Sequence, residues 1–140
     1  MNSSRLLGLA GAVLTLAGLL TGGLLSGAMT GTVPADAHLV LAAHLSALMG
    51  AFWIISVAWS LPYLRYGHVG ARRLAWAVIV PQYLNWSITL LKSFWGVHGV
   101  YFSGSARNRL VFAMLTLGVV IPSLLAASAW VYGFLAPPKV

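Results

Sequence analysis

Polar side chains inside apolar sequence are the residues of this protein most able to do chemistry. Residues 81–96 read PQYLNWSITLLKSFWG and carry amide, hydroxyl and amino groups within a run long enough to cross a bilayer. Hydrocarbon offers these groups no hydrogen bonds, so a helix surrounded by lipid carries them only at a cost in free energy. We therefore expect them to face a polar cavity, a ligand or other polar groups of the protein.

Helical spacing gathers the polar groups on one face of this segment. At about 100° per residue, an arc of roughly 120° holds six of them: Gln82, Asn85, Trp86, Thr89, Lys92 and Ser93. The opposite face, with Leu84, Ile88 and Leu91, suits lipid or packing. Bonds to neighbouring helices, worth about 1 kcal/mol or less each, are the alternative, but a full stripe exceeds what they require. We interpret the stripe as the wall of a site, and discount Lys92 because it lies near a helix end and can extend to the headgroups.

Among the four histidines, His44 is the candidate for a function. His68 and His98 are predicted in loops, and His38 lies at the mouth of the second apolar segment. His44 lies inside that segment, about 9 Å beyond His38 at a rise of 1.5 Å per residue. A histidine within the membrane is a functional hypothesis by default. The alternative is a neutral histidine bonded to a neighbouring hydroxyl or carbonyl group.

The residue types that are missing exclude several classes of function. The only acid is Asp36, so no span carries the carboxylate of a proton-coupled transporter, a paired-carboxylate hydrolase or a carboxylate-rich dimetal site. The absence of cysteine excludes thiolate haem ligation, iron–sulfur clusters and cysteine nucleophiles. A single histidine can still hold a haem iron with the opposite axial position open, and such an iron acts as a Lewis acid.

Four apolar segments position these residues. They cover 6–28, 38–64, 74–95 and 110–135, and each meets the requirement of about 20 residues for a spanning helix. The chain is 60% hydrophobic and 6% charged, and its short linkers leave no room for a soluble domain. We predict one domain over residues 1–140, an all-α integral membrane four-helix bundle. The first apolar run is too long for a signal peptide, so we expect it to be the first span.

Small residues form a stripe along the first segment. They are Gly8, Gly11, Thr15, Gly18, Gly22 and Ser26. Stripes of this kind let membrane helices approach closely, so we interpret this one as structural.

Charge predicts the orientation in the membrane. The formal net charge is +7, and the basic residues lie at segment ends instead of in a stripe interleaved with aromatic residues, so we expect no nucleic acid partner. One side carries Arg5, Arg65, Arg72, Arg73 and Lys139. The other side carries Arg107, Arg109 and the acid Asp36, with Lys92 near that end. The positive-inside rule then favours both termini in the cytoplasm, in what we expect to be a bacterial inner membrane.

Several short motifs resemble those of the hydroxylaminobenzene mutases. They are AHLSALMGAF in the second segment, the Leu61-Pro62 that ends it, ARRL at the entry to the third, YLNW at 83–86, TLLKSFWGVHG at 89–99, and NRL at 108–110. These mutases are small four-helix membrane enzymes that convert hydroxylaminobenzene to 2-aminophenol by moving the hydroxyl group within the molecule. The resemblance covers the second segment to the start of the fourth, and more weakly the first.

The sequence is also similar, more distantly, to styrene oxide isomerase, which rearranges aryl epoxides to aldehydes. That family holds haem b through a histidine of its second helix, at a subunit interface of a trimer. His44 stands at the matching place, and Asn85 matches an asparagine of the family's third helix. The chain departs from the family pattern at Gly50, Thr89 and Pro81, where the family has asparagine, tyrosine and aspartate. These departures count against epoxide chemistry.

Together the two resemblances imply one site and an order of candidate functions. His44 would be the axial ligand of a haem b iron, while Asn85, with Gln82, Tyr83 and Thr89, would line a pocket for a small aromatic substrate drawn from the lipid bilayer. A homo-oligomer is implied, as a trimer, and Arg107 or Arg109 would pair with the haem propionates or anchor in the headgroups. The first candidate is a hydroxylaminobenzene mutase-like isomerase. The second is an aryl epoxide isomerase, and the third is a non-enzymatic small transporter or structural subunit.

Overall fold

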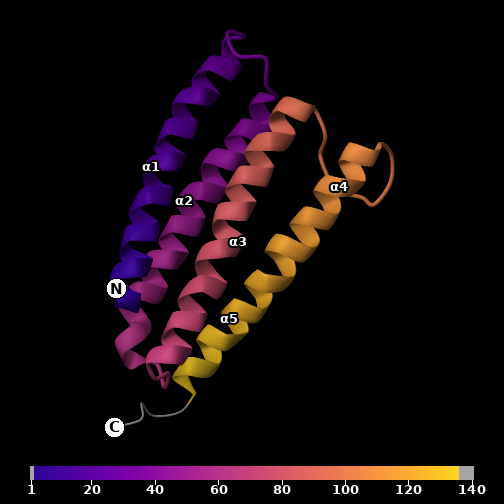
Figure 1. Cartoon of the computed structure of the whole chain (residues 1–140). Coiled ribbons are helices and arrows are strands. Elements are labelled where there is room, and N and C mark those ends of the chain that lie inside the picture. The colour runs from indigo at the N-terminus through magenta and orange to yellow at the C-terminus, as the bar shows by residue number, and fades with distance from the viewer. Residues whose placement is uncertain (1, 136–140) are drawn as a thin grey trace.

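Four long helices make up the computed structural model, which describes residues 2–135 (Figure 1). The elements are α1 (Ser3–Met29), α2 (Ala37–Ser60) with the 3-10 turn η1 (Leu61–Tyr63), α3 (His68–Trp95), α4 (Ala106–Leu115), the π-helical turn η2 (Thr116–Val120) and α5 (Ile121–Phe134). The last three form one continuous fourth span, and all four helices are long and apolar enough to cross a membrane. The predicted all-α four-helix membrane bundle is confirmed.

The helices extend beyond the predicted apolar segments. The prediction that His68 lies in a loop is wrong, because α3 begins at this residue and not at 74. The fourth span begins at Ala106 instead of 110, where the Ser105 hydroxyl accepts a hydrogen bond from the Asn108 amide. Hydropathy marks the hydrocarbon core, whereas polar helical turns continue into the headgroup layer. Lys139 lies outside the described residues.

The only acidic side chain caps a helix. The Asp36 carboxylate accepts hydrogen bonds from the backbone amides of His38 at 2.9 Å and Leu39 at 3.1 Å, at the start of α2. A carboxylate at this position satisfies amides that no helical carbonyl can reach. At the same end of the bundle, Gly96 closes α3 in the left-handed conformation with φ of 62°, which glycine adopts without strain.

Close packing of α1 on α2 follows the stripe of small residues. A Cβ atom on Gly11 would lie 2.6 Å from the Ile55 side chain, and one on Gly18 would lie 2.9 Å from the Leu48 side chain. The structural interpretation is confirmed at these positions, whereas Gly8 has no neighbouring atom within 4 Å. Glycine at such points lets two backbones approach to distances that any side chain would prevent.

The fourth span packs on α3 through α5 and η2, while α4 leans away from the bundle (Figure 1). The main core joins α1, α2, α3 and α5, and a smaller one is formed by Ile88, Val111 and Val119. Ile88 is only 3% exposed, so of the two surroundings that suit this face, lipid or packing, Ile88 has packing. Leu84 and Leu91 on the same side are partly exposed. Helical spacing identified this face as apolar, but it could not tell lipid from a fourth helix.

Candidate functional site

His44 is oriented by a carbonyl group of α1. Its Nδ1 atom lies 2.7 Å from the backbone oxygen of Gly18. Because a carbonyl oxygen only accepts, Nδ1 carries the proton, and Nε2 keeps its lone pair. The hydrogen bond to a carbonyl group that the alternative interpretation expected is therefore made by Nδ1. It also leaves Nε2 able to bind a metal, since ligating histidines donate their other N–H to such groups.

A second residue of α1, Gly22, gives the imidazole its space. A Cβ atom on Gly22 would lie 3.0 Å from Cε1 and 3.2 Å from Nδ1 of His44. The same atom would lie 3.8 Å from Nε2, so the crowding falls on the Cε1–Nδ1 edge of the ring. The stripe thus has a role at Gly22 that its small-residue pattern did not indicate: it fixes where the ring of His44 can lie.

Trp86 of α3 contacts the same turn of α1. Its Nε1–H donates to the Thr21 hydroxyl at 3.0 Å, and that hydroxyl donates to the Ala17 carbonyl at 2.8 Å. Thr21 is buried and lies between Gly18 and Gly22 in sequence, so α2 and α3 converge on one turn of α1. The sequence places Trp86 on the polar face of α3, but it does not identify Trp86 as a site residue. Nothing in the sequence indicates that Thr21 of α1 is its hydrogen-bond partner.

Gln82 bridges α2 and α5. The side chain is only 8% exposed, and its Nε2 donates to the Ser123 hydroxyl at 3.3 Å. Its Oε1 lies 3.0 Å from the point that a Cβ atom on Gly50 would occupy. The absence of a side chain at Gly50 thus makes room for the Gln82 amide, which is held between two helices.

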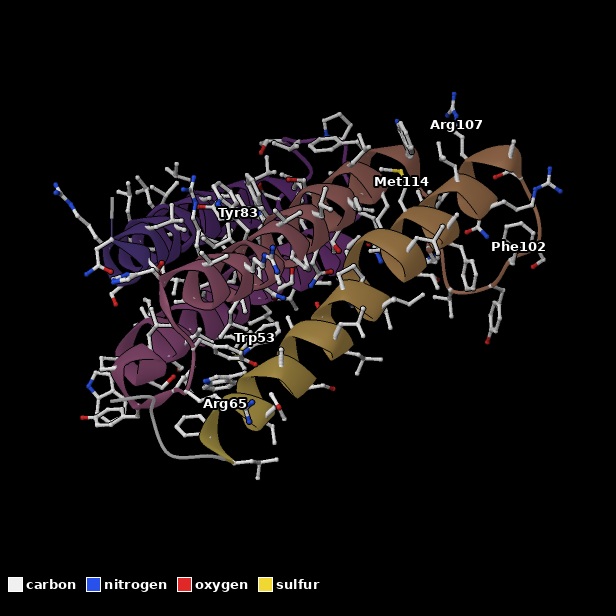
Figure 2. The ribbon with its side chains drawn as sticks, turned by 60° about the horizontal axis from the view of Figure 1, so that its bottom comes forward. Trp53, Arg65, Tyr83, Phe102, Arg107 and Met114 are labelled. Carbon is white, nitrogen blue, oxygen red and sulfur yellow. The ribbon has the colours of Figure 1, made fainter. Side chains whose placement is uncertain are left out.

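Tyr83 lies on another side of α3, against α1 (Figure 2). Its hydroxyl donates to the Ala10 carbonyl at 2.8 Å. The ring lines an open, apolar groove of about 450 Å³ between α1 and α3, which also includes Leu6, Trp76 and Val80. The structure therefore does not bring Tyr83 to the same neighbours as Gln82.

Asn85 has hydrogen-bonding capacity to spare within the span. It is half-buried, and its Oδ1 accepts a long hydrogen bond of 3.5 Å from the buried Thr89 hydroxyl. Its amide N–H groups donate to no residue in the described chain. Since no buried side-chain nitrogen or oxygen in residues 2–135 lacks a partner, this amide nitrogen lies at an accessible surface. It can donate to a group that the chain itself does not supply.

The remaining basic candidates lie near the same end of the bundle as His44. Lys92 donates to the His98 carbonyl at 3.3 Å in the loop that follows α3. The Arg107 guanidinium lies 5.9 Å above the Trp95 ring, on the outer side of α4 (Figure 2). Arg109 is exposed. Within the described residues, no hydrogen bond joins any of these side chains to His44 or Asn85.

The donor set at His44 fits haem better than a bare metal ion. Residues 2–135 contain no group of three or more His, Cys, Asp or Glu side chains that could hold a metal ion. A structural or catalytic zinc needs three or four protein ligands, whereas a porphyrin supplies four of its own and needs one axial side chain. His44, with Nδ1 bonded and Nε2 available, is a side chain of the type that such a group requires.

Comparison with known families adds to this geometry. The sequence profile of the family described as styrene oxide isomerase matches residues 3–135, which include all four spans. The chain belongs to the styrene oxide isomerase family. No curated protein sequence and no solved structure matches it. Membership identifies an isomerase-like membrane protein, and of the two enzyme families that the motifs resemble, the profile match favours styrene oxide isomerase.

Proposed function

We propose that the protein is a membrane isomerase that converts small aryl epoxides to aldehydes. The observation that carries this proposal is the His44 imidazole, whose Nδ1 is bonded to Gly18 at 2.7 Å within a membrane span of this isomerase family. The conversion gains and loses no atoms: one epoxide C–O bond breaks, a hydrogen shifts to the neighbouring carbon, and the oxygen forms a C=O bond. A carboxylate or a co-reactant is not needed, in agreement with a chain whose only acid is a helix cap.

Haem b is the cofactor that these residues fit, and His44 Nε2 would hold its iron. When bound, it would supply a Lewis acid for the substrate oxygen. The Gly18 carbonyl raises the electron density of the ring by accepting the Nδ1 proton in a hydrogen bond, which strengthens Nε2 as a donor. Gly22 keeps the ring from being pushed out of this orientation.

Asn85 is proposed as the residue that orients the substrate. Its accessible amide N–H groups can donate to a substrate oxygen, and the Thr89 hydroxyl holds the other end of the amide. Gln82 supports the same face from its bridge between α2 and α5, and Tyr83 ties α3 to α1. The apolar surroundings limit the access of water, which would otherwise open an epoxide to a diol.

Hydroxylaminoarenes are the second candidate substrates, favoured by the Asn85–Thr89 pair. An epoxide oxygen only accepts hydrogen bonds, whereas a hydroxylamino group both donates and accepts. The amide and hydroxyl of this pair also offer both functions, 3.5 Å apart. This conversion to a 2-aminophenol is also an isomerisation: the N–O bond breaks, a C–O bond forms at the ortho carbon, and that carbon's hydrogen moves to nitrogen.

A homotrimer with the cofactor near a subunit boundary is part of the proposal. His44 is only half-buried in the single chain, so part of the ring faces outward from the protomer. Arg107 and Arg109 are exposed at the same end of the bundle and could pair with the propionates. We further propose the bacterial inner membrane, with both termini in the cytoplasm, as the location.

The test is to incubate the detergent-purified protein with styrene oxide and hydroxylaminobenzene in parallel. We expect phenylacetaldehyde from the first, and 2-aminophenol from the second if the second candidate holds. Asn85→Ala should lower the turnover of the accepted substrate, whereas Asn108→Ala, in the first turn of α4, should not change it. If neither compound is consumed, the isomerase proposal fails, and the non-enzymatic alternative of a transporter or structural subunit takes its place.

A further inference from the structure

One histidine and two arginine side chains line a hollow at the start of α3. His68, Arg72 and Arg73 line an open space of about 600 Å³ together with Val69 and Trp76. All three are exposed, and they lie at the end of the bundle opposite the Asp36 cap. Because the chain has no other acidic side chain, none is available to neutralise the two arginines.

This placement of charge is unfavourable for the helix itself. The start of a helix carries a partial positive charge, so acidic residues stabilise its first turns and basic ones oppose them. The first turn of α3 contains no acid, and its N-cap Gly67 has no side chain to cap the amides. By contrast, the guanidinium of Arg65 at the same end is stacked over the Tyr132 ring at 4.0 Å. An external anion at the hollow would offset the charge that the chain leaves unbalanced.

The hollow continues into an apolar groove. Trp76 lines both, and the groove runs from it along α3 to Leu84, against Leu6, Leu9 and Val13 of α1. The only hydroxyl group in the groove wall, that of Tyr83, is already bonded to the Ala10 carbonyl. The groove therefore offers surface for hydrocarbon and no free group for a polar substrate.

The order of these two parts matches one kind of molecule. From Trp76 to Leu84 the groove extends for about 12 Å at 1.5 Å per residue, close to the roughly 15 Å of one hydrocarbon leaflet. Indole rings favour the boundary between headgroups and hydrocarbon, which is where Trp76 would lie. A second copy of the chain could cover the groove, but it would also have to bring acidic groups to the hollow, and this chain has none to offer there.

We propose that α1 and α3 form a binding site for one anionic phospholipid. Its phosphate binds His68, Arg72 and Arg73, and an acyl chain lies in the groove between Trp76 and Leu84. The site is separate from His44, which contacts α1 at Gly18, about one and a half turns of helix beyond the last groove residue of α1, Val13. The proposal does not depend on which substrate the protein isomerises.

Native mass spectrometry of the detergent-purified protein tests the headgroup half of the site. We titrate phosphatidylglycerol, phosphatidylethanolamine and inorganic phosphate. Arg72→Gln/Arg73→Gln should weaken phosphatidylglycerol binding about 30-fold, from the usual contribution of two basic residues near a membrane surface. The matched control Arg107→Gln/Arg109→Gln removes the same charge at the other end and should leave the affinity unchanged. Equal losses in both double variants would overturn the proposal, as would equal binding of the two lipids.

A second pair of variants tests the groove and does not depend on the charge changes. Val80→Trp narrows the groove at an exposed position and should release the lipid, whereas Leu16→Trp, exposed on α1 outside the groove, should not. Inorganic phosphate should bind far more weakly than phosphatidylglycerol, because it lacks the acyl chain. The proposal is wrong if inorganic phosphate binds with the same affinity as phosphatidylglycerol. It is also wrong if Val80→Trp dissociates the oligomer while the lipid stays bound.

Discussion

Replacing Gly22 with alanine tests how α1 positions the His44 ring. The new Cβ would lie 3.0 Å from Cε1 and 3.2 Å from Nδ1, whereas ordinary contacts of a Cβ atom lie at 3.4–4 Å. The ring must therefore move by a few tenths of an ångström, away from the Gly18 carbonyl that it now contacts at 2.7 Å. Overpacking costs about 1–3 kcal/mol, and a weakened hydrogen bond adds up to about 1 kcal/mol. We expect a net loss of stability of that order.

The neighbouring residue provides a matched control. Gly23 lies on the same turn, and a Cβ atom there would meet nothing within 4 Å. Gly23→Ala should be neutral or stabilise the helix by up to about 1 kcal/mol, because alanine is the better helix former. Thermal unfolding in detergent then compares two identical chemical changes on adjacent residues, one of which touches His44.

The absorption spectrum gives the second readout of this pair. Gly22→Ala should shift the Soret band and lower the haem content, whereas Gly23→Ala should leave both as in the wild type. A purely structural role for Gly22 would change the unfolding temperature and leave the spectrum of the folded fraction unchanged. If the two variants have the same stability and the same spectrum, the idea that α1 positions the imidazole is wrong.

Three further predictions concern α3 and the loop after it. Asn85→Ala should lower kcat by about 10- to 100-fold with little change in unfolding temperature, since the lost amide donors contact no other residue of the described chain; an unchanged kcat would remove Asn85 from the site. Trp86→Phe and Thr21→Val should each lower the free energy of unfolding by about 1 kcal/mol, because both remove the same hydrogen bond of 3.0 Å. The double variant should lose no more than the larger single loss, and additive losses would contradict this coupling. Asn108→Ala should make the loop 96–105 more sensitive to limited proteolysis, because the side chain accepts from the Gly99 amide and donates to the carbonyls of Tyr101 and Ser103, each at 2.8 Å; unchanged cleavage would show that these bonds do not hold the loop.

Hydropathy was sufficient to predict the four spans, since membrane helices need long apolar runs whatever their partners are. The helix ends were predicted less well, because the first turns of α3 contain His68, Arg72 and Arg73 and carry no apolar signal. The π-helical turn at Thr116–Val120 was not foreseen either. It adds one residue to a helical turn, and such turns arise from local packing more than from residue type.

The candidate site could be predicted only in its parts. His44 and Asn85 stand out by residue type within apolar sequence, and the structure gives each a free hydrogen-bonding atom. The roles of Gly18, Gly22 and Trp86 depend on which helices are neighbours in the bundle. The residue pattern of a single sequence does not show which helices pack against each other. The polar face of α3 illustrates the difference: Gln82 and Trp86 bond to neighbouring helices, Thr89 and Ser93 bond within α3, and Asn85 offers accessible amide donors.

We propose that His44 Nε2 holds the iron of a haem on which the isomerisation depends. The most direct measurement is the absorption spectrum and turnover of His44→Ala with and without added imidazole, beside His98→Ala as a control in the loop. We expect His44→Ala to lose the wild-type Soret band and activity, added imidazole to restore both in part, and His98→Ala to resemble the wild type. A wild-type protein that is colourless yet active, or a His44→Ala variant with unchanged spectrum and turnover, would contradict this assignment of His44.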